Sequence, residues 1–129
     1  MNTGDEFGPY PVIVTREQLV RYAGASDDYN PIHYDDELAR SLGLPGVIVH
    51  GMLAMGLMVR LVTENVPDLG GVEKFNVRFR QMIQPGQPLV ITARVKGVDS
   101  GTADLDVQLA VEGQRPAVTG KMRVRLKSL

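Results

Sequence analysis

Apolar and polar residues alternate with a period of two along the second half of the chain. Four such runs occur, at residues 74–80, 89–96, 104–111 and 118–126. Turn residues separate the runs, at Pro85-Gly86, Asp99-Ser100-Gly101 and Gly113. Successive side chains of a β-strand point to opposite faces of the sheet, so this alternation predicts strands with one buried face. The short turns between them favour a meander of antiparallel strands.

The first half of the chain has a different pattern, which predicts helices joined by loops. A short apolar run at residues 10–14 is typical of a strand. Thr15 follows it, and Gln18 stands three residues further on, which is the spacing of a capping box at a helix start. We expect this helix to stop near Gly24.

Two more helices are expected before the alternating runs begin. Asp35 can cap a short helix over residues 36–42. A longer helix is predicted to start near His50 and to end before Pro67, because a residue preceding proline disfavours helical backbone. Its apolar residues lie on nearly all sides, which indicates a helix covered by the rest of the protein. Together the two halves predict an α+β protein in which a curved antiparallel sheet wraps around one long central helix.

Composition and charge narrow the classes of function. A chain of 129 residues with ordinary globular composition is expected to form a single domain, residues 1–129. Its formal net charge of -1 gives no strong field, so neither nucleic acid nor a membrane surface is an expected partner. The absence of cysteine excludes disulfides, thiolate catalysis and thiolate metal sites. Since no signal peptide or membrane span is evident, we expect a cytoplasmic protein.

Candidate chemistry gathers in a polar loop at residues 25–34. It contains a carboxylate and an imidazole, Asp28 and His33, which together can exchange protons with a substrate. Asn30 and Pro31 lie between them and predict a turn that can aim both side chains at one point. Considered by spacing alone, the loop is more typical of a solvated turn in front of a helix-capping aspartate.

A second candidate lies at the start of the long helix, in Val49-His50-Gly51-Met52. The first amides of a helix have no partner within it, and glycine lets a ligand approach the backbone closely. The amide of Gly51 can therefore bind a carbonyl oxygen that gains negative charge. The alternative is that Gly51 only permits tight packing. His33 and His50 lack an ordered metal-ligand spacing, so no metal is expected.

The segment Tyr22-Ala-Gly-Ala-Ser-Asp-Asp-Tyr-Asn-Pro-Ile-His33, followed by Ile48-Val-His-Gly-Met52, resembles the hydratase motif of MaoC-like dehydratases. That family includes R-specific enoyl-CoA hydratases and (3R)-hydroxyacyl-acyl-carrier-protein dehydratases of actinobacterial type. The resemblance covers most of the chain and implies the hot-dog fold, a sheet wrapped around a central helix. It also implies reversible hydration of trans-2-enoyl thioesters or dehydration of (3R)-3-hydroxyacyl thioesters, carried by coenzyme A or by acyl carrier protein, with no cofactor.

The resemblance further implies roles for individual residues. Asp28 and His33 match the catalytic pair, Asn30 matches the asparagine that supports the site, and Gly51 matches the glycine whose amide contacts the thioester carbonyl. In hydration Asp28 would activate water for attack at C3, while His33 would help bind that water and protonate C2. The two titrations are coupled, so each proton belongs to the pair rather than to one residue.

The chain departs from the family pattern in two ways. Asp27 stands where the family often has glycine, which places a second carboxylate beside Asp28. The chain is also a single hot-dog unit, so we expect an acyl pocket to need another subunit, in a homodimer or a heterodimer. Thioester hydrolysis and a non-catalytic acyl-binding or stabilising role are the alternatives. Four strand arginines are candidates for a phosphorylated carrier arm, although strand charges usually form the solvated face: Arg78, Arg80, Arg94 and Arg123.

Overall fold

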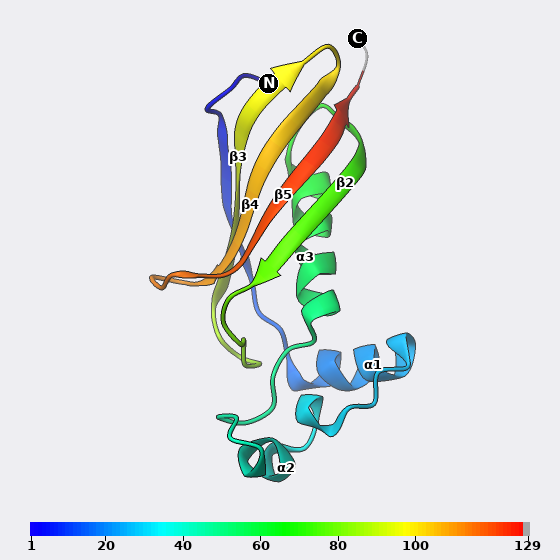
Figure 1. Ribbon diagram of the computed structural model, residues 1–129, viewed down its shortest axis with the longest axis vertical. Helices are drawn as coiled ribbons and strands as arrows, with labels where there is room; N and C mark the ends of the chain where they lie inside the picture. Colours follow the sequence, from blue (N-terminus) through cyan, green and yellow to red (C-terminus); the bar gives the residue numbers. More distant parts are fainter. Residues whose placement is uncertain (128–129) are drawn as a thin grey trace.

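The computed structural model describes residues 1–127, and Figure 1 shows the arrangement of its elements. The helical elements are α1 (Arg16–Ser26), the 3-10 turn η1 (Pro31–His33), α2 (Asp36–Ser41) and α3 (Gly51–Asn65). The strands are β1 (Glu6–Val12), β2 (Leu69–Phe79), β3 (Leu89–Asp99), β4 (Thr102–Val111) and β5 (Pro116–Leu126). No helix in this part of the chain is long and apolar enough to span a membrane.

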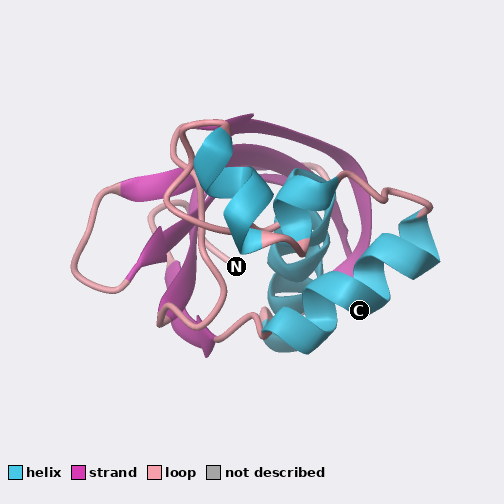
Figure 2. Cartoon of the chain, turned by 90° about the horizontal axis from the view of Figure 1, so that it is seen from below, coloured by secondary structure: helices cyan, strands magenta, loops and turns pink. Residues whose placement is uncertain are grey.

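Within residues 1–127 the five strands form one antiparallel sheet in the order β1-β3-β4-β5-β2. The sheet curves around α3, as the view along the strands in Figure 2 shows. Strands β3, β4 and β5 form the expected meander, but the expectation that all four alternating runs belong to it is wrong at β2. That strand lies beyond β5, because β1 occupies the free edge of β3.

The core lies between the inner face of the sheet and one side of α3. Its α3 members are Ala54, Leu57, Met58 and Val62. Alternate residues of the strands supply the other side, as the period of two predicts, for example Ile91, Leu105, Val107, Leu109 and Met122. The expectation that α3 is covered on nearly all sides is only partly correct: Met52 is 65% exposed, because the described sheet encloses one side of the helix and not the other.

The helix-start signals of the first half are confirmed. The Thr15 hydroxyl accepts a hydrogen bond from the Gln18 amide at 3.1 Å, and the Gln18 side chain accepts one from the Thr15 amide at 2.8 Å. Asp35 caps α2 by accepting from the Leu38 amide at 3.1 Å. Helix α1 runs past Gly24 to Ser26, two residues beyond the predicted stop. Figure 1 shows that α1 and α2 lie near the first turn of α3, where the candidate site is found.

Candidate active site

The C-terminus of α1 sets the position of Asp28. The amides of Asp27 and Asp28 both donate to the carbonyl of Ala23, which closes the last turn of the helix. Asp27 has a left-handed backbone (φ 57°, ψ 27°), a conformation that glycine adopts at no steric cost. This backbone suits the glycine that the resemblance to the family implies at this position. The Asp27 side chain is exposed, and the Asp28 side chain is about half exposed.

Asn30 shapes the turn that carries His33. Its side-chain oxygen accepts a hydrogen bond from the Ile32 amide at 3.3 Å, and Pro31 occupies the first position of the turn. The amide of Asn30 in turn donates to the Asp28 carboxylate at 3.3 Å. Asn30 therefore connects the two candidate catalytic residues through its backbone and its side chain.

The imidazole of His33 is buried and held by a residue far away in the sequence. Its Nδ1 atom lies 2.8 Å from the carbonyl oxygen of Ile48, and the Ile48 amide donates to the Ile32 carbonyl at 3.0 Å. A carbonyl oxygen can only accept, so Nδ1 carries a proton, and in the neutral ring Nε2 keeps its lone pair. That Nε2 atom lies 3.8 Å from Oδ2 of Asp28. The structure thus brings Asp28 and His33 together.

His50 is a third member of the cluster, and its part in the site was missed by the sequence analysis. Its ring stacks on that of His33 with centroids 3.7 Å apart and planes 22° apart. Tyr22 packs edge-on against the same ring, with centroids 4.8 Å apart. Burial lowers the pKa of His50, the neighbouring His33 lowers it further, and Asp28 acts in the opposite direction. His50 is therefore neutral near pH 7.

One nitrogen or oxygen from each of Asp28, His33 and His50 lies within 4.8 Å of the others, which is close enough to raise the question of a metal ion. The geometry is poor for one. The lone pairs of stacked imidazoles lie in nearly parallel planes, so they do not converge on a single ion at bonding distance. Nδ1 of His33 is also bonded to Ile48. The expectation of no metal stays a prediction, with this geometry in its favour.

Gly51 is the first residue of α3, and His50 before it makes no side-chain capping bond within the described residues. The Gly51 amide therefore has no intrahelical partner, as helix geometry requires. A cavity of about 180 Å³ lies beside it. The cavity is lined mainly by apolar residues: Ile48, Val49, Gly51, Ala54, Phe79, Gln81, Met82, Ile83 and Val118. Phe79 and Met82 are 54% and 60% exposed, so the cavity has an open apolar rim.

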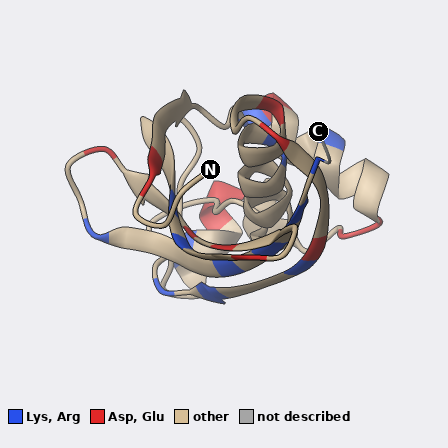
Figure 3. Cartoon of the chain, turned by 90° about the horizontal axis from the view of Figure 1, so that it is seen from above, with Lys and Arg blue, Asp and Glu red and all other residues tan. Residues whose placement is uncertain are grey.

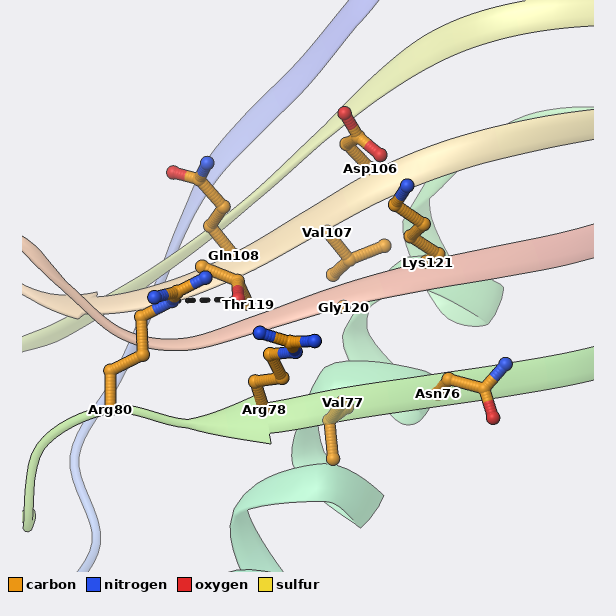
Figure 4. Close-up of a pocket in the computed structure, with 10 residues that line it drawn as sticks. All are labelled: Asn76, Val77, Arg78, Arg80, Asp106, Val107, Gln108, Thr119, Gly120 and Lys121. Carbon is orange, nitrogen blue, oxygen red and sulfur yellow. Dashed lines mark hydrogen bonds between the residues drawn. The ribbon is translucent and has the colours of Figure 1, made fainter.

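A larger hollow, of about 550 Å³, lies on the outer face of β2, β4 and β5 and contains none of the cluster residues (Figure 4). Arg80 donates to the Thr119 hydroxyl there at 3.0 Å, and Arg123 pairs with Asp104 nearby at 3.1 Å. Figure 3 shows both signs of charge interspersed along this side of the sheet. The arrangement is that of a solvated strand face, and a role for its arginines in carrier binding stays a prediction.

The sequence and the fold have clear relatives. The MaoC like domain matches residues 2–115, so the chain belongs to the MaoC-like family. The (R)-specific enoyl-CoA hydratase of Aeromonas caviae is 28% identical over 112 residues, which cover 84% of each protein. Fatty acid synthase subunit beta of Aspergillus oryzae is 36% identical over 95 residues, covering 71% of this chain. The chain spans only 5% of the length of that subunit.

Solved structures confirm the hot-dog fold that the resemblance implies. The (R)-hydratase from A. caviae involved in PHA biosynthesis superposes with a TM-score of 0.89 at 25% identity, over 98% of this chain and 97% of that one. A MaoC-like dehydratase superposes with a TM-score of 0.91 at 33% identity. That match covers 98% of this chain and 41% of the dehydratase.

Proposed function

We propose that this protein catalyses the reversible addition of water to trans-2-enoyl thioesters, which gives (3R)-3-hydroxyacyl thioesters. The observation that carries the proposal is the pairing of the Asp28 carboxylate with Nε2 of His33, 3.8 Å apart. That distance is too long for a direct hydrogen bond, but an oxygen atom between the two can bond to both. A water molecule bound there would be the nucleophile for attack at C3.

The proton balance of this reaction suits the pair. The water oxygen forms a bond to C3, and one of its protons passes to the carboxylate and imidazole pair. The pair returns one proton to C2, so it ends each cycle in its starting state, and dehydration follows the same steps in reverse. Charge that develops on the thioester oxygen during the step would be stabilised by the amide of Gly51 at the start of α3.

The acyl chain of the substrate needs an apolar enclosure that this chain alone supplies only in part. The cavity beside Gly51 is small, and its rim at Phe79 and Met82 is exposed. We propose that a second hot-dog subunit, in a homodimer or a heterodimer, covers this rim. The ChsH1-ChsH2 complex from Mycobacterium tuberculosis contains a chain of the same fold (TM-score 0.87, 18% identity). Sedimentation of the wild type and of Met82→Asp tests this: the variant should dissociate, and an unchanged assembly contradicts the proposal.

The test of the reaction is an assay with crotonyl-CoA and longer enoyl-CoA substrates, which follows loss of the enoyl absorbance and formation of the 3-hydroxyacyl product. Asp28→Asn and His33→Ala should each lower kcat by about 10²- to 10⁴-fold, the usual contribution of general acid–base catalysis. Asp27→Asn is the matched control, because it removes an exposed carboxylate one residue away and asparagine tolerates the left-handed backbone.

Three outcomes decide between the proposal and its alternatives. Wild-type turnover in both Asp28→Asn and His33→Ala would contradict the assignment of the pair. Release of free thiol without a 3-hydroxyacyl product would indicate thioester hydrolysis. Binding of the acyl thioester without any turnover, alone or with a partner subunit, would indicate a non-catalytic acyl-binding or stabilising subunit.

A further inference from the structure

His50 stands at a position where its side chain does nothing for the helix it precedes. It is the N-cap residue of α3, a position that favours serine, threonine, aspartate or asparagine because their side chains accept from the first amides. The imidazole makes no such bond within the described residues and turns inward, where it is 1% exposed. Helix capping therefore does not explain a histidine here.

Nor does core packing explain it. Neither ring nitrogen of His50 makes a well-formed hydrogen bond among residues 1–127, although the backbone of Asp28 lies near enough to act to raise the pKa of the ring, and a buried polar group without a well-formed bond destabilises a fold. A phenyl or aliphatic side chain would avoid that cost. The contact that His50 does make is with the proposed catalytic imidazole, at a centroid distance of 3.7 Å.

We propose that His50 is a positioning residue, whose ring holds the imidazole plane of His33 so that Nε2 faces Asp28. The bond from Nδ1 to the Ile48 carbonyl fixes one atom of the His33 ring, but it leaves the ring free to tilt about that atom. A flat ring stacked at 22° removes this freedom. Tyr22, packed edge-on against His50, in turn limits the motion of His50 itself.

The neutral state of His50 also matters for its stacking contact with His33. The titratable groups that face it are His33 on η1, Asp28 at the end of α1, and Tyr22 within α1. A second positive charge stacked on His33 would oppose any step in which His33 takes a proton. Burial keeps His50 uncharged near neutral pH, so the stack can accommodate a proton on His33 during turnover.

This inference rests on the proposed function for its kinetic test, but not for its structural one. His50→Ala, which removes the stacked ring, should lower kcat by about 10- to 100-fold with KM little changed, as a small misplacement of a catalytic group does. In the ¹⁵N spectrum of the imidazoles, His33 should change from one tautomer, protonated at Nδ1, to a mixture, because a ring that tilts loses the alignment of the bond from Nδ1 to the Ile48 carbonyl that selects this tautomer. The spectrum tests the positioning even if the wild type shows no hydration of crotonyl-CoA, a result that would count against the proposed function alone.

Two planar replacements of His50 distinguish the effect of its flat ring from the effect of its ring nitrogens. His50→Phe keeps a stacking surface and removes both nitrogens, and His50→Gln offers a smaller planar amide if the phenyl ring prevents folding. At least one of them should fold and restore kcat and the single His33 tautomer. Leu105→Ala, a truncation in the core of β4, is the control for general destabilisation and should leave both readouts unchanged.

Other results would overturn the inference. A folded His50→Ala variant with wild-type kcat and an unchanged His33 tautomer would show that the stack positions nothing. Folded Phe and Gln variants as slow as the alanine variant would show that a nitrogen of His50, rather than its flat ring, is what the site requires.

Discussion

The ring of Phe79 lies directly against Gly51. A Cβ atom built on Gly51 would be 3.0 Å from Cζ of Phe79 and 3.2 Å from Cε1. Such contacts are tighter than a packed interior normally contains, so the absence of a side chain at residue 51 lets the end of β2 approach the start of α3. The same absence leaves the Gly51 amide accessible from the cavity.

Gly51→Ala should therefore impair the site more than the fold. The added methyl group must either push the exposed Phe79 ring outward, which changes the rim of the cavity, or shift the first turn of α3, which moves the proposed oxyanion donor. We expect a loss of about 10²- to 10³-fold in kcat, as when an oxyanion donor is removed. Steady-state kinetics with crotonyl-CoA measures it.

Gly56→Ala is the matched control for this substitution. It lies in the same helix, and an added Cβ there meets no described heavy atom within 4 Å. Since alanine favours helix, this variant should be more stable by about 0.4–1 kcal/mol and fully active. Equal activity of the two glycine variants would argue against a role for the Gly51 amide.

Asn30→Ala should affect both stability and turnover. It removes the acceptor for the Ile32 amide and with it the cap of the turn that carries His33. We expect a loss of about 1 kcal/mol in the free energy of unfolding, typical of a lost N-cap, with a fall in kcat. Thr15→Ala removes the cap of α1 instead and should lower stability similarly while kcat is preserved. If both variants keep full activity, Asn30 does not support the site.

The contacts of Asp36 predict that the free energy of unfolding decreases in acid. Its carboxylate accepts from the Val47 amide at 3.0 Å and pairs with Arg16 at 2.8 Å, and these contacts lower its pKa. A lowered pKa in the folded state gives stability that is present above the unfolded value of 3.8 and is lost as the pH falls through the folded value.

Urea unfolding of wild type and Asp36→Asn at neutral pH and near pH 3 checks this. The wild type should be the more stable of the two at neutral pH, and the difference should shrink in acid. Arg16→Gln should reduce the effect only in part, because the Val47 amide remains. A difference between wild type and Asp36→Asn that does not change with pH would contradict the prediction.

The lowered pKa of His50 predicts a second pH effect, at milder acidity. The unfolded chain takes up a proton at His50 as the pH falls below about 6.5, whereas the folded chain resists it. The stability contribution of a neutral His50 is therefore complete above that value and is lost as the pH falls toward the lowered folded pKa. His50→Phe should remove this component, seen as a smaller difference in melting temperature between mildly alkaline and mildly acidic buffer. An identical difference in both proteins would show that His50 does not titrate in this way.

Much of the fold follows from local patterns, and the exceptions have a common cause. The caps at Thr15 and Asp35 are confirmed because a cap depends on residues three positions apart. Alternation in β2 also predicted which of its side chains face the core. It did not predict that β5 would be the neighbouring strand, because a period of two indicates the direction of side chains and not the identity of the adjacent strand. The exposed side of α3 at Met52 has the same origin: apolarity does not say what covers it.

The limit of what local sequence patterns can predict is clearer at the candidate site. Spacing alone favoured a solvated turn at Asp28 and His33, and the contact that orients His33 comes from Ile48, fifteen residues away. His50 was considered as a helix start and, with His33, as a metal ligand, but not as a partner of the His33 ring, although the chain has only two histidines. The resemblance to a family located the loop and the glycine. The stack of the two imidazoles depends on how α3 meets η1 and is visible only in three dimensions.

The place of β2 in the sheet also constrains how the chain can fold during synthesis. This strand is made before β3, β4 and β5, yet its neighbour within residues 1–127 is β5, the last of the five described strands to be made. Until residues 116–126 have left the ribosome, β2 lacks the one strand with which it pairs among residues 1–127, and the placement of Phe79 against Gly51 then depends on the contacts of β2 with α3. A chain that stops before β5 would therefore lack one wall of the candidate site, even though the residues of the hydratase motif were all made long before.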